Sequence, residues 1–148
     1  MPSRRKLFAA ATAAALPVAA GAAAQSTAKA KKQAWQRSNA KGMPLYSQIT
    51  AFGDLVFAAG HGVADGDAKA QTTRVLDQIS EALQRAGSSM EKVLKCNVYL
   101  ATLDDYKAMN EAFMGRFGAE PPVRTTIAVA GGIPLKGCLV EIDVIAHR

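Results

Sequence analysis

The end of the chain constrains its fold most, because a helix-breaking proline pair is followed there by two apolar strands. The prolines at 121–122 end any preceding helix and favour an extended backbone just before them. Alternation of residue types over 124–130 predicts a strand that begins with Arg124. A turn rich in glycine and proline then leads to a second predicted strand, 138–146, which carries Glu141. An arginine and a carboxylate on these two strands predict one small polar site.

A β-hairpin is predicted further upstream. Two short strands, 49–52 and 55–59, are joined by Gly53 and Asp54, a residue pair that suits a two-residue turn. The next segment, 60–67, is predicted to be a glycine-rich loop. It lacks the spacing of a phosphate-binding loop and is not followed by Gly-Lys-Ser/Thr, so a nucleotide site is not expected.

Two helices are predicted, with a strand between them. The first is capped by Asp67 and stops at a glycine, and its apolar residues recur at helical spacing: Val75, Leu76, Ile79, Ala82, Leu83 and Ala86. The second begins at Asp104 or Asp105 and ends at Gly118, with an apolar stripe of Tyr106, Met109, Phe113 and Phe117. The strand between them, 93–100, has a predicted apolar face of Leu94, Cys96, Val98 and Leu100.

The predicted elements follow the order strand, strand, helix, strand, helix, strand, strand. This order predicts an α/β (α+β) fold, a two-layer sandwich in which two helices cover one face of a mixed sheet. The other face of the sheet has no helix to cover it. We therefore expect the chain to associate with itself.

The first 24 residues have the features of an export signal. Arg4 and Arg5 open a basic segment, an alanine-rich apolar run follows, and small residues at 22–24 form a cleavage site. The adjacent arginines indicate the twin-arginine route, which predicts a periplasmic or secreted protein. A general secretory signal and an uncleaved membrane anchor are the alternatives.

The positive charge of the chain is concentrated near its start. The net charge is +6. The excess of lysine and arginine lies in the signal and in residues 25–42, which are predicted to form a polar and basic linker. From residue 42 onward there are 10 basic and 12 acidic residues, a net charge of −2. The predicted domain, 43–148, therefore lacks the excess of positive charge that binding to nucleic acid requires. We also expect no membrane partner after signal cleavage. Trp35 is expected to begin the ordered structure in a short edge strand.

Cysteine and histidine are too rare for a metal site or a disulfide framework. Cys96 and Cys138 are the only cysteines, and His61 and His147 the only histidines. In an oxidising compartment the two cysteines form a disulfide or remain two buried apolar thiols. No serine–histidine–aspartate or cysteine–histidine arrangement is evident from the spacing.

Three consecutive elements near the C-terminus form a specific pattern: P-V-R-T-T-I-A-V-A, a loop containing glycine and proline, and L-V-E-I-D-V-I-A-H-R. This pattern resembles the C-terminal signature of the Rid family, the reactive intermediate deaminases, also called the YjgF or L-PSP family. Weaker matches extend upstream to about Tyr46, so the resemblance covers roughly residues 43–148. It implies a chorismate-mutase-like fold and a homotrimer with clefts between neighbouring subunits.

The resemblance also implies roles for individual residues. Arg124 matches the arginine that binds the substrate's carboxylate, a task that suits a planar guanidinium. From the residues alone, an ion pair between Arg124 and Glu120 is the alternative. Glu141 matches a glutamate that holds or activates a water, and is otherwise a half-exposed strand carboxylate. Tyr46 matches an aromatic residue of the cleft and Asn110 a helix asparagine beside it, with a surface tyrosine and a solvated asparagine as alternatives.

The chain departs from the family pattern at positions that bear on the substrate. Ala59 stands where many members have a serine, and Thr126 replaces a common cysteine. His61 follows Gly60 in place of a glutamine and is predicted to replace lost polar contacts or to transfer protons, unless it is merely a solvated loop residue.

The function implied by the resemblance is hydrolytic deamination of reactive enamines and imines. The substrate is expected to carry a carboxylate, and the reaction needs an anion clamp, a positioned water and a proton shuttle. Arg124, Glu141 and His61 are the candidates, and no cofactor motif is visible. The alternative is a non-catalytic small-ligand-binding or chaperone-like module on the same scaffold, and ribonuclease activity is a weaker third reading.

Overall fold

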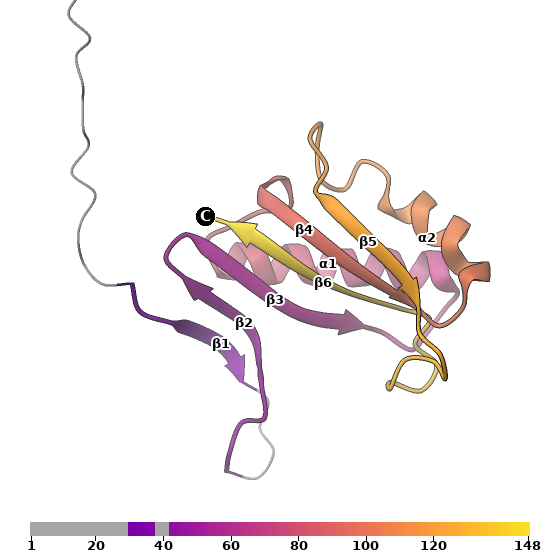
Figure 1. Cartoon of the computed structure of the whole chain (residues 1–148), viewed down its shortest axis with the longest axis horizontal. Coiled ribbons are helices and arrows are strands. Elements are labelled where there is room, and N and C mark those ends of the chain that lie inside the picture. Colours follow the sequence, from indigo (N-terminus) through magenta and orange to yellow (C-terminus); the bar gives the residue numbers. More distant parts are fainter. Residues whose placement is uncertain (1–29, 38–41) are drawn as a thin grey trace, which may run out of the picture.

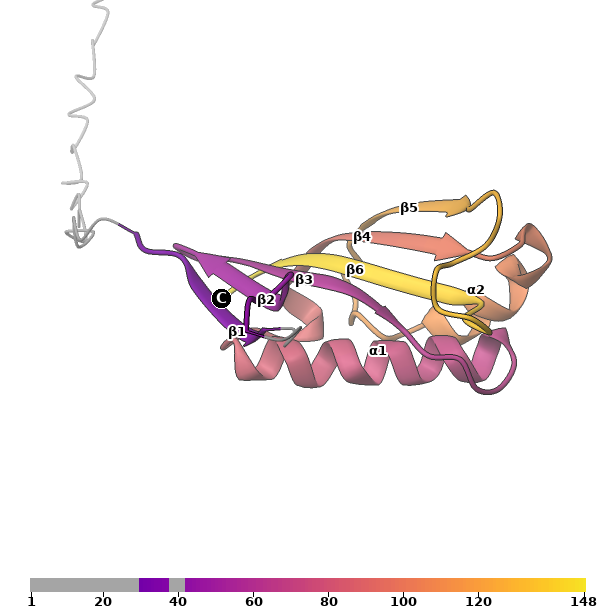
Figure 2. The ribbon, with the colours of Figure 1, turned by 90° about the horizontal axis from the view of Figure 1, so that it is seen from below.

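The predicted two-layer architecture is confirmed. The computed structural model describes residues 30–37 and 42–148, so the predicted export signal lies outside the described residues. The strands are β1 (Gln33–Arg37), β2 (Ser47–Phe52), β3 (Leu55–Gly62), β4 (Val93–Leu100), β5 (Val123–Ala128) and β6 (Val140–His147). The helices are α1 (Ala68–Arg85) and α2 (Tyr106–Phe113), with short 3-10 turns η1 (Met90–Lys92) and η2 (Leu103–Asp105). Both α-helices lie on one face of the sheet (Figure 1, Figure 2).

The strands form one mixed sheet in the order β1-β2-β3-β6-β4-β5. β4 and β5 are parallel and are connected through α2, whereas every other neighbouring pair is antiparallel. The last strand, β6, lies between β3 and β4 near the centre of the sheet (Figure 1). Strands distant in sequence therefore become neighbours.

The two faces of the sheet differ in what covers them. On the helix-covered face, alternate residues of β6 and β4 are buried against the helices: Val140, Ile142, Val144, Ala146, Cys96, Val98 and Leu100. On the opposite face, here called the open face, large apolar side chains remain exposed: Phe52, Leu55, Phe57, Val123 and Ile127. Successive side chains of a strand point to opposite faces of a sheet, which is why buried and exposed apolar residues alternate along these strands.

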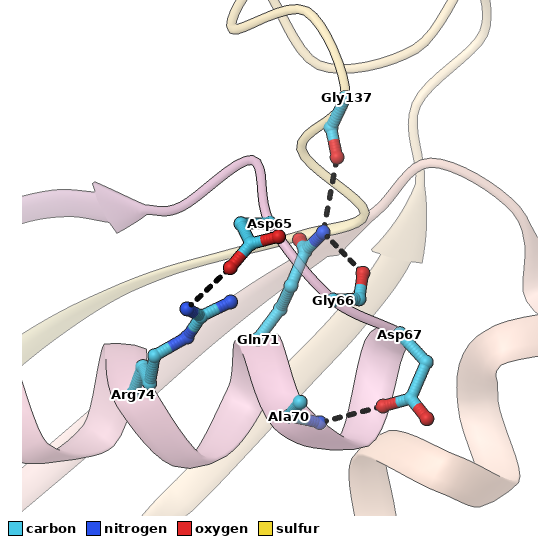
Figure 3. Close-up of polar contacts among 7 residues, drawn as sticks. All are labelled: Asp65, Gly66, Asp67, Ala70, Gln71, Arg74 and Gly137. Carbon is cyan, nitrogen blue, oxygen red and sulfur yellow. Dashed lines mark hydrogen bonds and ion pairs between the residues drawn. The ribbon is translucent and has the colours of Figure 1, made fainter.

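Local sequence signals explain where several elements begin and end. Phe52 pairs with Leu55 across the predicted two-residue turn, and Gly53 adopts a φ of 59°, which glycine tolerates readily. Asp67 caps α1 as predicted, because its carboxylate accepts a hydrogen bond from the Ala70 amide at 2.8 Å (Figure 3). None of the helices in the described part of the chain is long and apolar enough to cross a membrane.

Other element boundaries differ from the sequence-based predictions. The second helix was predicted to end at Gly118 but ends at Phe113, because Met114 takes up extended ψ and Gly115 a positive φ of 72°. Phe117 is still buried and stacks on Phe113, but it does so from a turn. Leu94 was predicted on the apolar face of its strand and is instead exposed, because the ladder with β6 shifts register there.

Two segments of the sheet lie within the predicted linker and the predicted glycine-rich loop. Residues 33–37 of the predicted linker form β1, the edge strand expected around Trp35, which pairs with β2. β3 extends to Gly62, so His61 lies in a strand and not in a glycine-rich loop. A register shift between Ala58 and His61 accommodates the extension.

Gln71 joins the start of α1 to two loops. Its side chain is 1% exposed, and its amide nitrogen donates to the carbonyl oxygens of Gly66 and Gly137, each at 3.0 Å (Figure 3). Its amide oxygen accepts from the Leu139 amide at 2.8 Å. The loop after β3 and the loop before β6 are therefore held together by one side chain, and these loops flank the strand ends that carry His61 and Glu141.

Replacing this glutamine should destabilise the fold. Gln71→Leu keeps a similar volume but leaves buried backbone groups without partners, so we expect the free energy of unfolding to fall by about 2–4 kcal/mol. The exposed Gln78 on the same helix provides the control, and Gln78→Leu should change the free energy by less than about 0.5 kcal/mol. Urea unfolding measures both; equal effects would contradict the role assigned to Gln71.

Candidate functional site

Arg124 lies near the start of β5 and points towards α2. It pairs in register with Cys96, which is fully buried, so the two side chains share the helix-covered face. One guanidinium nitrogen donates to the Asn110 side-chain oxygen at 2.8 Å, and another lies 3.8 Å from the Met109 sulfur. The guanidinium carbon lies 4.7 Å from the centre of the Phe113 ring. The structure thus brings together Arg124 and Asn110, two of the predicted site residues.

The guanidinium of Arg124 is held without an acidic partner. Among the described residues it forms no salt bridge, and the ion pair with Glu120 that was the alternative is not formed. Its face packs on Phe113, which leaves N–H groups at its edge. A half-buried, unpaired guanidinium of this kind can bind an anion bidentately.

A pocket of about 640 Å³ opens beside Arg124. It is bounded by α2, by the turn that follows α2 and by the start of the segment leading to β5. Its lining residues are Tyr106, Lys107, Asn110, Glu111, Phe113, Met114, Gly115, Arg116, Phe117, Gly118, Pro121 and Arg124. The apolar stripe predicted on the second helix supplies part of this wall, although its spacing indicated no role in a site.

Thr126 lies two residues after Arg124 on the same face of β5. It pairs with Val98, and its hydroxyl is buried without a hydrogen-bond partner in the described part of the chain. A buried hydroxyl without a partner is costly. The cysteine that Thr126 replaces in the family pattern would carry a smaller penalty, because a thiol is a weak donor.

Glu141 lies on the open face, next to Gly60. It pairs with Tyr99 in β4, and together they line a hollow of about 210 Å³ whose other walls are Val129, Ile133 and Pro134. A Cβ atom at Gly60 would overlap a carboxylate oxygen of Glu141. The absence of a side chain at residue 60 therefore creates the space that this carboxylate occupies.

Arg124 and Glu141 do not form one polar site within a single chain, contrary to the expectation from their two strands. Arg124 is in register with Cys96 on the helix-covered face, whereas Glu141 is in register with Tyr99 on the open face. β4 also separates their two strands. The sheet order and the register, which the sequence does not reveal, decide this arrangement.

The other two predicted residues lie apart from the Arg124 pocket. His61 is half-buried in β3, and its Nδ1 donates to the Ala59 carbonyl oxygen at 2.7 Å, which leaves Nε2 as the acceptor of the ring. Tyr46 precedes β2 and is 57% exposed. Neither residue lines the pockets that contain Arg124 and Glu141.

A hydrogen-bonded group that sequence reasoning missed lies beside Glu141. Asp143 accepts hydrogen bonds from the Asn97 amide at 2.9 Å and from the Tyr99 hydroxyl at 3.0 Å. Donation to the Asp143 carboxylate raises the pKa of the Tyr99 phenol, and partial burial adds to the effect. The alternation of apolar and polar residues along β4 and β6 indicates that these polar side chains lie on one face of the sheet. Only the antiparallel register of the two strands brings them together.

The two cysteines remain thiols. Both are buried, and burial raises the pKa of Cys96 to about 12 and raises that of Cys138 as well. Cys96 pairs with Val144, six residues beyond Cys138 along the chain, which corresponds to roughly 20 Å of strand and is too far for a disulfide. The described residues contain no group of three or more histidine, cysteine, aspartate or glutamate side chains that could hold a metal ion.

Comparison with known proteins identifies the family. The model of the family described as Endoribonuclease L-PSP matches residues 37–148. The chain belongs to the Rid/YjgF/L-PSP family. The mitochondrial protein mmf2 of Schizosaccharomyces pombe is a relative of this Rid-family chain, 40% identical over 109 residues that cover 68% of the chain and 86% of mmf2.

Solved structures of the family support the same assignment. A YjgF family member from Neisseria meningitidis has a TM-score of 0.71 and 27% identity, covering 80% of this chain and 95% of its own. RidA of an Antarctic Psychrobacter species has a TM-score of 0.66 and 31% identity, covering 76% and 94% respectively. The chorismate-mutase-like α+β fold expected for the Rid-family chain is thereby confirmed.

Proposed function

We propose that this Rid-family protein hydrolyses reactive enamine and imine intermediates that carry a carboxylate. The unpaired guanidinium of Arg124 in its pocket is the observation on which the proposal rests. It would bind the carboxylate through two parallel N–H···O bonds, with Asn110 fixing its orientation. A lysine at this position would keep the charge but lose the planar fork.

The reaction needs only proton transfers and one water. Protonation of an enamine at carbon gives an iminium ion, the protonated imine, and water then adds to its carbon and loses a proton to form a carbinolamine. Proton transfer to nitrogen and collapse of this adduct break the C–N bond and release ammonia and a 2-oxo acid. Glu141 is suited to accept a proton from the attacking water, and the Nε2 of His61 is a second proton-accepting group.

We propose that Glu141 reaches the substrate from a neighbouring subunit. Within one chain Glu141 lies on the opposite face of the sheet from Arg124, so one chain does not supply both groups to one ligand. The open face carries the exposed side chains of Phe57, Val123 and Ile127, which contact with another copy would cover. A homotrimer with clefts between subunits would combine the two residues.

The separation of Arg124 and Glu141 is also the basis for the alternative function, a non-catalytic binding module. If Glu141 does not reach a bound ligand, the scaffold is a non-catalytic module that binds small carboxylates through Arg124. Release of ammonia from freshly generated 2-aminoacrylate distinguishes the two functions, because a binding module releases none above the spontaneous rate. Ribonuclease activity, which the family description names, is disfavoured by the net charge of −2 from residue 42 onward.

A substitution at Arg124 tests the clamp. Arg124→Ala should keep the fold and lower kcat/KM on 2-imino acids by about 10²-fold or more, because a charge-assisted hydrogen bond and orientation of the substrate are both lost. Arg124→Lys should restore only part of the rate. Arg74→Ala, which breaks an exposed ion pair with Asp65, is the control and should leave the rate unchanged. Unchanged turnover in a folded Arg124→Ala protein would refute the clamp.

Mixed oligomers test whether the site is shared. The Arg124→Ala and Glu141→Gln proteins should each be nearly inactive. Co-expressed at equal levels, they should recover about a quarter of the wild-type activity, because random assembly places an intact Arg124 next to an intact neighbouring Glu141 in that share of the clefts. Light scattering should give about three times the chain mass. A monomer, or mixed oligomers with no recovered activity, would exclude the shared cleft.

We also propose that the protein is exported and that residues 1–24 are removed. The order of basic, apolar and small residues supports this proposal. N-terminal sequencing of the protein from the periplasm or medium should begin at Gln25, and replacement of Arg4 and Arg5 by lysine should retain the precursor inside the cell. An intact Met1 in the exported protein would rule out cleavage.

A further inference from the structure

The pocket beside Arg124 is much larger than a carboxylate and an imine require. Its volume of about 640 Å³ falls in the range that holds a drug-sized ligand, whereas the imine derived from alanine has only six non-hydrogen atoms. Such a small substrate would occupy the polar end formed by Arg124 and Asn110. Most of the pocket would then remain empty or filled with water.

The remaining wall of the pocket is largely apolar and aromatic. Phe113 and Phe117 pack together with ring centroids 4.9 Å apart, and Tyr106, Met114 and Pro121 complete the apolar surface. Tyr106 and Met114 are 44% and 73% exposed, so their side chains are accessible from the pocket's open side. Phe113 and Phe117 are themselves buried, so a ligand with an aromatic group would pack against the exposed side chains of Tyr106 and Met114 and cover apolar surface there.

Apart from Arg124, three charged residues line the pocket, of which Lys107 adds positive charge and the other two are already paired. Glu111 pairs with Lys69, and Arg116 pairs with Asp77, so both charges are already engaged outside the pocket. The anion site at Arg124 and the aromatic wall therefore select two different parts of one molecule. The hollow at Glu141 offers no comparable volume, at about 210 Å³.

We propose that this pocket gives the protein a preference for 2-imino acids with aromatic side chains, and that Tyr106 and Met114 determine the preference. The inference rests on the proposed deaminase function, whose carboxylate clamp it retains. The carboxylate binds at Arg124, and the aromatic ring extends along the wall of α2 towards Phe117. Because a single methylene in an apolar pocket changes kcat/KM by about tenfold, a whole ring should have a larger effect.

Hydrolysis of two imines tests the preference. Imines of phenylalanine and alanine are generated in situ by an amino acid oxidase, and release of the 2-oxo acid is followed above the spontaneous rate. In the wild-type protein kcat/KM should be about 10²-fold higher for the phenylalanine imine. In the Tyr106→Ser, Met114→Ser double variant this ratio should fall by about tenfold or more. Leu103→Ser is the matched control: Leu103 is exposed just before α2 and does not line the pocket, so its replacement should leave the ratio unchanged.

Binding of the products separates this inference from the proposed function. Phenylpyruvate should bind the wild-type protein at least about tenfold more tightly than pyruvate, and the double variant should lose this difference. If this binding preference is found without any turnover, the pocket assignment stands and the deaminase function fails. If both imines are hydrolysed at equal kcat/KM, the deaminase function stands and the aromatic preference is overturned.

Discussion

The insertion of β6 between β3 and β4 is the interaction on which the rest of the structure depends. β6 is the last strand of the chain, yet it forms ladders with β3 on one side and β4 on the other. It also buries four alternate side chains against the helices. Without it, the β1–β2–β3 meander and the β4–α2–β5 unit would have no shared sheet. Such long-range pairing carries a large loop-closure cost that only the assembled core offsets.

The same insertion distributes the polar groups between the two faces. Each strand alternates its side chains, so a residue's face depends on its register with its neighbours. Arg124 is consequently fixed under α2, where Phe113 and Asn110 orient it, and Glu141 is fixed on the open face beside Tyr99. The fold thus places an unpaired guanidinium and a carboxylate on opposite faces of the sheet. Under the proposed function, the two groups would meet only where subunits meet, so catalysis would depend on assembly.

Local chemistry made much of the fold predictable. The Gly53–Asp54 turn, the Asp67 cap and the apolar spacing of α1 each act within a few residues, and the structure confirms them. The predictions failed where distant contacts decide the outcome. His61 lies in a strand because β6 pairs with it, and α2 ends at Phe113 although Phe117 continues its apolar spacing. For the site, the family pattern assigned Arg124 and Asn110 to one cleft without predicting their hydrogen bond, and the face occupied by Glu141 required the sheet order.

The close approach of Gly60 to Glu141 has an evolutionary consequence. Because any side chain at residue 60 would occupy the place of the Glu141 carboxylate, the effects of substitutions at these two positions are not independent. A lineage that loses the glutamate becomes free to accept alanine or serine at residue 60. A lineage that first acquires a side chain at residue 60 can no longer hold the carboxylate in this position. The order in which mutations arise at this pair therefore affects which descendants of the scaffold keep a carboxylate in this position.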